Sequence, residues 1–179
     1  PRSARNFIRK RFGMQADIMK FYTSIYLATE SFHWQKVLWR RNFTEEEEVY
    51  IMTRLIFGLS CSAKLSQIAL QLICEYVEEN CEECKERGGK EGCKNLSHEF
   101  TKVAEGAYVD DLIHSTETRE KGIRIMEYVE KTLRKFGLWI KGYYHSGKIR
   151  EEGDSNLDGK GEMGMAGYRW DPLKDLSLI

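Results

Sequence analysis

Three aspartates in this 179-residue chain have the residue type and spacing for metal-dependent chemistry. Asp17 stands alone in the apolar stretch FGMQADIMKFYTSIYL, and Asp110 and Asp111 follow the apolar run AEGAYV. A carboxylate in such surroundings must be hydrogen-bonded or functional, because burying it unpaired is costly. Three converging carboxylates would repel one another, and a hard divalent cation such as Mg²⁺, which prefers oxygen ligands, would relieve that repulsion.

Two such ions about 3.5–4 Å apart can clamp the attacking and leaving oxygens of an in-line phosphoryl transfer. The spacing alone also allows another interpretation. Asp110-Asp111 would then be an ordinary turn pair, because aspartate is favoured at tight turns, and Asp17 would cap a strand end.

The elements predicted around these residues would bring the three aspartates together. The expected order is a strand at Asp17, a helix over 62–80, two short strands meeting at Asp110-Asp111, a helix over 118–136 and a strand over 138–144. This is a split β-α-β-β-α-β core of the α+β class. The first strand and the hairpin strands are neighbours at the centre of such a sheet, so we expect Asp17 beside the aspartate pair.

Periodic apolar residues and end signals define the two helices. The first should begin at Ser62 as N-cap and bury one apolar face. That face comprises Leu65, Ile68, Ala69, Leu72, Ile73, Tyr76 and Val77. The second should end before Gly137. Its predicted core face comprises Ile123, Met126, Val129, Leu133 and Phe136.

The remaining segments predict peripheral structure. Strand formers over 32–41 and 49–57 flank the polar connection NFTEEEE and indicate a β-hairpin. Its mixture of aromatic and basic residues fits two alternatives, stacking on a single-stranded template or the inner face of the hairpin. The charged, glycine-punctuated segment over 78–100 has no sustained period and indicates an insertion, and MAGYRWDPLKDLSL predicts a terminal hairpin about Asp171-Pro172.

Composition limits the class of protein. The chain is 41% hydrophobic and 12% aromatic, enough to fill a core, and its 28 basic residues balance its 28 acidic ones. Binding to a polyanion must therefore come from local patches. No apolar run approaches the roughly 18–20 residues of a membrane span, so no membrane partner is expected. Because the chain begins with Pro1, we expect a processed or excised piece of a longer protein.

The cysteines allow a second metal hypothesis. Five cysteines, an odd number, fit reduced thiols better than a disulfide framework. Cys81, Cys84, Cys93 and His98 form the spacing C-x₂-C-x₈-C-x₄-H, and thiolates with an imidazole are the usual ligands of zinc. The surrounding glutamates and lysines favour a plain charged excursion, so zinc is not the expected cofactor.

Five segments, in order along nearly the whole chain, resemble the motifs of reverse transcriptases. Tyr108-Val109-Asp110-Asp111 is similar to the Y-x-D-D box, DIMKFY to the first catalytic box, and FGLSCSAKLSQIAL to the box that opens a helix over the nucleotide. RKFGLWIKGYY and AGYRWDPLKD are similar to the segments that lead to and form the primer grip. The phrase FHWQKVLWRR and the long insert before the aspartate pair resemble BEL/Pao long-terminal-repeat retrotransposons in particular.

The resemblance implies a polymerase palm, a partial fingers hairpin, and RNA-directed DNA synthesis with two Mg²⁺ ions, for which Mn²⁺ can substitute. The implied metal ligands are Asp17, Asp110, Asp111 and the backbone carbonyl of Ile18. The implied nucleotide-binding residues are Ile18, Tyr22, Phe57 and Gly58, with Tyr22 as the gate against a ribose 2′-hydroxyl. The implied primer grip contains Gly167 and Tyr168. Ala63 departs from the family, which usually has proline there, and Lys141, Lys148 and Lys160 are equally good candidates for the general acid toward pyrophosphate.

The resemblance also implies partners and boundaries. All of 1–179 would be a reverse transcriptase fragment, with a fingers-like hairpin over 28–60, a charged insert over 78–102 and a primer-grip-like hairpin over 163–179. Partners would be an RNA or DNA template with its primer, deoxynucleoside triphosphates, and the missing fingers, thumb and ribonuclease H segments of a larger polyprotein. Copying in this family takes place in cytoplasmic particles, which is the expected location.

Three other functions compete with this one. RNA-recognition modules share the β-α-β-β-α-β topology, but their glycine-aromatic signature is absent. Nucleotide cyclases on a related palm would carry a G-G-[DE]-[DE]-F hairpin, which is also absent. The third is a catalytically inactive or co-opted retroelement fragment that binds nucleic acid or serves a structural role.

Overall fold

A computed structural model shows two compact units, one of residues 1–19 and 70–179 and one of residues 20–69. The structure describes residues 10–87, 96–145, 163–165, 168–171 and 176–178. No helix in these described ranges is both long enough and apolar enough to span a membrane.

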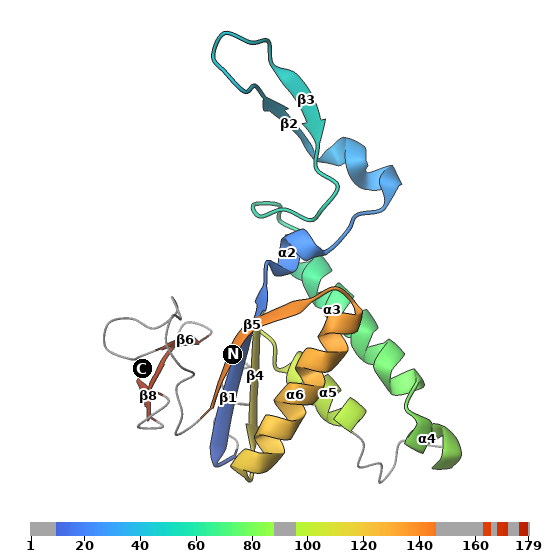
Figure 1. Cartoon of the computed structure of the whole chain (residues 1–179), viewed down its shortest axis with the longest axis vertical. Coiled ribbons are helices and arrows are strands. Elements are labelled where there is room, and N and C mark those ends of the chain that lie inside the picture. The colour runs from blue at the N-terminus through green and yellow to red at the C-terminus, as the bar shows by residue number, and fades with distance from the viewer. Residues whose placement is uncertain (1–9, 88–95, 146–162, 166–167, 172–175, 179) are drawn as a thin grey trace. The chain divides into compact units, whose positions relative to one another are not determined.

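A three-stranded antiparallel sheet forms the centre of the larger unit (Figure 1). Strand β1 (Phe12–Met19) lies between β4 (Asp111–Thr116) and β5 (Trp139–His145). Residues 13–16 of β1 are all buried, so both faces of the central strand are covered there. Three of these four residues are apolar or small, as burial on both faces requires, and Gln15 is the polar exception.

Two helices cover one face of this sheet. Helix α6 (Arg119–Lys135) packs against all three strands, and α5 (Leu96–Glu105) packs against β4 and α6. The hydroxyl of Thr118 caps α6 by accepting a hydrogen bond from the backbone N–H of Lys121 (3.3 Å). After α6, Gly137 adopts a φ of 73°, a left-handed conformation that glycine adopts without strain. The end signal predicted from the sequence is therefore confirmed.

A glycine in α6 sets how closely that helix approaches the central strand. A Cβ atom on Gly122 would lie 2.4 Å from the Sδ atom of Met14, closer than real contacts allow. Met14 therefore faces α6. Because side chains alternate along a strand, Gln15 and Asp17 face the opposite side of the sheet.

The predicted four-stranded core is wrong in one element. Residues 104–109 were expected to form a strand before the aspartate pair, but α5 continues to Glu105 and a tight turn follows. Phe100 and Val103 are buried at helical spacing, and Ala104 has high helix propensity, so the apolar run extends a helix. The helix ends before Gly106, whose N–H bonds back to the carbonyls of Lys102 and Val103. The fold remains mixed α and β, with three strands in the core sheet.

Helix α3 (Ser62–Glu79) has nearly the predicted bounds but buries a different face. The buried positions are Ser62, Ser66, Leu70 and Cys74. Leu65, Ile68, Leu72 and Tyr76 of the predicted core face are exposed. The helix is turned by about one residue, or roughly 100°, from the prediction. The predicted N-cap is wrong by one residue, because the N–H of Leu65 bonds to the carbonyl of Cys61 and Ser62 is the first residue of the helix. The hydroxyl of Ser62 donates instead to the carbonyl of Ile56.

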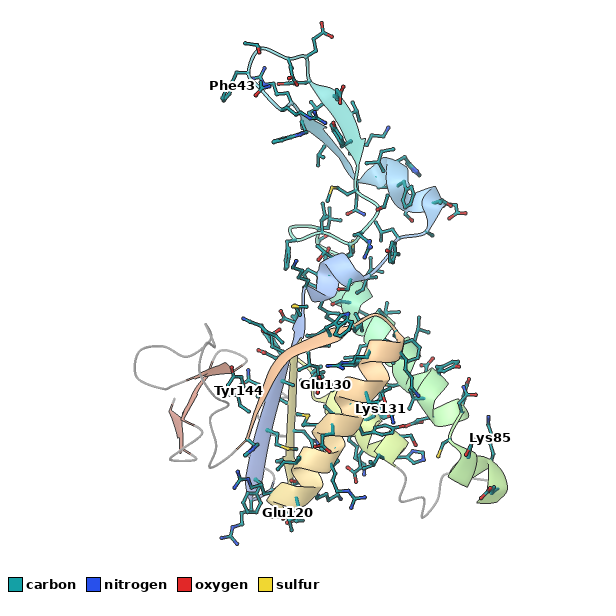
Figure 2. The ribbon with its side chains drawn as sticks, in the orientation of Figure 1. Phe43, Lys85, Glu120, Glu130, Lys131 and Tyr144 are labelled. Carbon is teal, nitrogen blue, oxygen red and sulfur yellow. The ribbon has the colours of Figure 1, made fainter. Side chains whose placement is uncertain are left out.

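The smaller unit contains short elements and a two-stranded ribbon. Besides the first turns of α3, it contains the helix α2 (Phe21–Ser24), the 3₁₀ helix η1 (Thr29–Trp34) and the strands β2 (Lys36–Trp39) and β3 (Glu48–Ile51). The predicted hairpin is present, although its strands are shorter than expected and residues 29–34 are helical. Phe43 lies in the loop between the strands and is 91% exposed (Figure 2).

Two peripheral regions complete the described chain. The insert contains α4 (Glu82–Arg87) and the start of α5, while residues 88–95 lie outside the described ranges. Near the C-terminus, β6 (Met163–Met165), β7 (Tyr168–Asp171) and β8 (Leu176–Leu178) form a separate antiparallel sheet in that order. The segment predicted as one hairpin thus has three strands.

Candidate active site

The pairing of β1 with β4 sets Asp17 directly opposite Asp111. Residues opposite each other in an antiparallel pair lie on the same face of the sheet, with Cβ atoms about 4.5–5.5 Å apart. Both aspartates are partly exposed, on the face away from α6. Two residues far apart in sequence are therefore neighbours, as predicted.

A tight turn holds the backbone of Asp110 next to strand β1, beside Ile18. The backbone groups of Tyr108 and Asp111 bond to each other (2.8 and 3.0 Å), and the N–H of Ile18 donates to the carbonyl of Asp110 (2.9 Å). Val109 adopts a φ of 57°, which β-branched residues rarely occupy. Strain of this kind is concentrated at functional sites. The turn thus holds the aspartate pair beside the residue that follows Asp17.

Gln15 is a functional candidate that sequence analysis missed. Its Nε2 atom donates to Oδ1 of Asp111 (3.0 Å), and its side chain is only 4% exposed. One pattern in the sequence could have found it. Gln15 is a polar residue two positions before Asp17 in an apolar run, and a period of two places both side chains on one face.

A β-bulge lies beside Asp17. On β5, Gly142 pairs with Asp17 and Ile140 pairs with Ile18, so Lys141 is the extra residue between them. Bulges twist a strand locally and re-aim a side chain, and they are common next to active sites. Of the three lysines considered as the general acid, Lys141 is at this bulge, whereas Lys148 and Lys160 lie outside the described residues.

The donor atoms of the three aspartates suit a hard divalent cation, since carboxylate oxygens are the ligands Mg²⁺ prefers. In the described ranges of the chain, no group of three or more His, Cys, Asp or Glu side chains is gathered closely enough to hold a metal ion. The pairing of β1 with β4 places the carboxylates of Asp17 and Asp111 on one face of the sheet. To bind a cation, these two side chains and that of Asp110 would have to turn toward a common point.

The predicted zinc ligands are only partly described. Cys81 is buried, and Nδ1 of His98 lies 3.6 Å from Oε1 of Glu78. Cys93 and the side chain of Cys84 lie outside the described part of the structure. The zinc hypothesis and its rejection both stay predictions.

The predicted nucleotide-binding residues of the smaller unit lie together. The rings of Tyr22 and Phe57 are 4.8 Å apart between centroids and tilted by 54°. Tyr22 is buried, whereas Phe57 is 70% exposed. Gly58 has a φ of 91°, which favours glycine, and a Cβ atom there would meet nothing within 4 Å. Ile18, in the larger unit, has a fully buried side chain.

The other predicted contacts with nucleic acid are described less completely. Gly167 lies outside the described residues, and Tyr168 is the first residue of β7. In the smaller unit, Trp34 at the end of η1 and Trp39 at the end of β2 are exposed, and an ion pair joins Arg40 to Glu47 (3.8 Å). Both tryptophans are therefore accessible to a ligand.

Two buried groups in the larger unit are held neutral at physiological pH. Burial lowers the pKa of His114 on β4 to about 4; the neighbouring Glu99 opposes this shift, and nearby lysines add to it. Nε2 of His114 lies 3.9 Å from Oε2 of Glu99, too far for a hydrogen bond. Burial likewise raises the pKa of the Cys74 thiol to about 12, helped by nearby glutamates. Neither group is suited to proton transfer near pH 7.

Comparisons with known proteins concern the family and the fold of the chain. Residues 2–142 match the family described as "Reverse transcriptase (RNA-dependent DNA polymerase)". No curated protein matches the chain. A solved structure of the foamy viral protease-reverse transcriptase in complex with an RNA/DNA hybrid has a similar fold, with a TM-score of 0.54 at 19% identity. The alignment covers 96% of this chain and 18% of the viral chain.

This chain thus corresponds to about a fifth of that viral protein, and the likeness between them concerns the fold. The family match is independent of that likeness and covers well over half of the chain, including all three aspartates. The chain belongs to the reverse transcriptase family.

Proposed function

We propose that this chain is the polymerase core of a reverse transcriptase, which adds deoxynucleotides to a primer 3′ end on an RNA or DNA template. The observation that carries the proposal is the pairing of Asp17 with Asp111, with the backbone of Asp110 bonded to Ile18. In this proposal the carboxylates of Asp17 on β1, Asp111 on β4 and Asp110 in the turn before β4 together carry out nucleotidyl transfer.

In this proposal Asp17, Asp110, Asp111 and the carbonyl of Ile18 hold two Mg²⁺ ions, for which Mn²⁺ can substitute. When bound, the ions activate the primer hydroxyl and neutralise charge on the leaving pyrophosphate. The chain's own contribution is to hold the carboxylates at one end of a rigid sheet. Lys141, placed at the bulge beside Asp17, is the lysine best situated to give a proton to pyrophosphate.

Selection of the sugar is assigned to the smaller unit. Tyr22 is buried against the ring of Phe57, so its own ring has little freedom to move. A fixed ring that occupies the space of a 2′-hydroxyl would reject ribonucleotides. Gly58, with its left-handed backbone, allows close approach of the nucleotide to the main chain.

Finer assignments complete the proposal. The phrase FHWQKVLWRR and the long insert support a BEL/Pao-like retrotransposon as the source. Gly167 and Tyr168 would contribute to the primer grip. Fingers, thumb and ribonuclease H segments of a larger polyprotein would complete the enzyme, which would work in cytoplasmic particles.

The test is primer extension on an RNA template with Mg²⁺ or Mn²⁺, using the purified chain and the chain with flanking polyprotein segments restored. Asp17→Asn and Asp110→Asn should each abolish extension without unfolding the chain, as checked by circular dichroism. Glu127→Gln is the matched control, because it removes an exposed carboxylate on α6. Extension that survives either aspartate variant would refute the assignment.

The same assay tests the alternative of an inactive or co-opted fragment. A folded chain that binds primer–template but extends nothing, even with its flanking segments, would support that alternative. The described side chains are not gathered into a metal site, which is the observation in its favour.

A further inference from the structure

Gln15 has surroundings that fix its side chain in one position. On β1 it pairs with Ile113 of β4 on one side and Tyr144 of β5 on the other. All three side chains are almost fully buried and lie on the same face of the sheet. An amide enclosed in this way has little rotational freedom, so its hydrogen bond to Oδ1 of Asp111 (3.0 Å) has a defined direction.

The chemistry of this contact suits a residue that orients a metal ligand. Asp111 lies two residues along β4 from Ile113, on the same face, so Gln15 reaches it diagonally across the two strands. The amide is neutral, so it can direct one carboxylate oxygen without cancelling the charge that attracts a cation. A lysine or arginine at this position would compete with the cation for that charge.

We propose that Gln15 is a positioning residue that holds the Asp111 carboxylate in the orientation required to bind a divalent cation. This inference rests on the proposed role of the three aspartates. Losing a hydrogen bond to a metal ligand typically weakens metal affinity about 10–100-fold. We expect a loss in that range when the Gln15 amide is removed.

The chain contains a matched control for this change. Gln71 also donates from Nε2 to a carboxylate, Oε1 of Glu75 (3.1 Å), but this pair is exposed on α3. Gln15→Met and Gln71→Met each remove one glutamine-to-carboxylate hydrogen bond while nearly preserving side-chain length. Only the first should alter metal binding.

The experiment is a titration of the 179-residue chain with Mn²⁺, with free ion measured by electron paramagnetic resonance. Gln15→Met should bind Mn²⁺ about 10–100-fold more weakly than the unaltered chain, and Gln71→Met should bind it equally well. Equal affinity in a folded Gln15→Met chain overturns the inference. Asp111→Asn separates the metal role of Asp111 from the positioning role of Gln15. Unaltered Mn²⁺ binding in Asp111→Asn would overturn the metal role of Asp111, and the role of Gln15 would fall with it.

A second measurement needs no folded Gln15 variant. The side-chain amide resonance of Gln15 in a ¹⁵N-labelled chain should shift when Mg²⁺ is added, whereas that of Gln71 should stay in place. A Gln15 resonance that does not move while Mg²⁺ binds would also overturn the inference. A shift that disappears in Asp111→Asn would support it.

Discussion

Replacing His114 with glutamine should make the fold less sensitive to acid. His114 lies on β4, three residues after Asp111, and is buried against α5. The charged groups that act on it are Glu99, Lys10, Lys102 and Lys121. Because burial disfavours the imidazolium, the pKa of His114 is about 4 in the folded chain and 6.5 in the unfolded chain.

The sign and size of the effect follow from these two values. Between pH 6.5 and 4 the unfolded chain binds a proton that the folded chain does not, so stability falls as the pH falls. The full difference, 6.5 − 4 = 2.5, corresponds to about 3 kcal/mol. Between pH 7.5 and pH 4.5 the free energy of unfolding falls by about 2.5 kcal/mol of this amount. Above pH 6.5 His114 is neutral in both states and costs nothing.

The assay is urea unfolding at pH 7.5 and pH 4.5, followed by circular dichroism. His114→Gln should lose about 2.5 kcal/mol less stability than the unaltered chain over this interval, because glutamine does not titrate. His33→Gln, which removes an exposed histidine of η1, is the control and should behave like the unaltered chain. Equal acid sensitivity in the unaltered chain and His114→Gln would refute the reasoning.

Three further predictions follow from other contacts. Gly122→Ala should destabilise the chain by about 1–3 kcal/mol in urea unfolding, because its Cβ would overlap Met14; unchanged stability would show that Met14 can move aside. Iodoacetamide should modify exposed Cys61 much faster than Cys74, whose thiol pKa burial raises to about 12, and similar rates in peptide mass spectra would contradict this. Tyr22→Ala should raise ribonucleotide incorporation relative to deoxynucleotide incorporation about tenfold or more in primer extension, and an unchanged ratio in an active variant would reject the gate.

Local patterns predicted most of the elements around the site. The helices expected over 62–80 and 118–136 are α3 and α6 within a residue or two at each end, and the strand at Asp17 is β1. The strand wrongly predicted over 104–109 also has a local cause. The apolar run over 104–109 carries no period of its own, so sequence alone could not distinguish the end of a helix from a strand.

Packing explains the error in the buried face of α3. Its apolar residues cover a broad arc, and the periodicity does not say which part of that arc faces inward. The structure buries Leu70 and Cys74 and leaves Leu72 and Tyr76 exposed. The shape of the neighbouring elements decides which side of the arc is buried. The sequence of the helix alone does not contain that information.

The amino-acid sequence alone predicts the types of chemistry available, the order of the main elements and the proximity of Asp17 to the aspartate pair. Those features depend on residue identity and on patterns a few residues long. The tertiary structure establishes that Asp17 pairs with Asp111, that a bulge on β5 puts Lys141 next to Asp17, and that Gln15 bonds to Asp111. Gln15 and Asp111 are 96 residues apart, and contacts of that range arise from strand register, which no local pattern specifies.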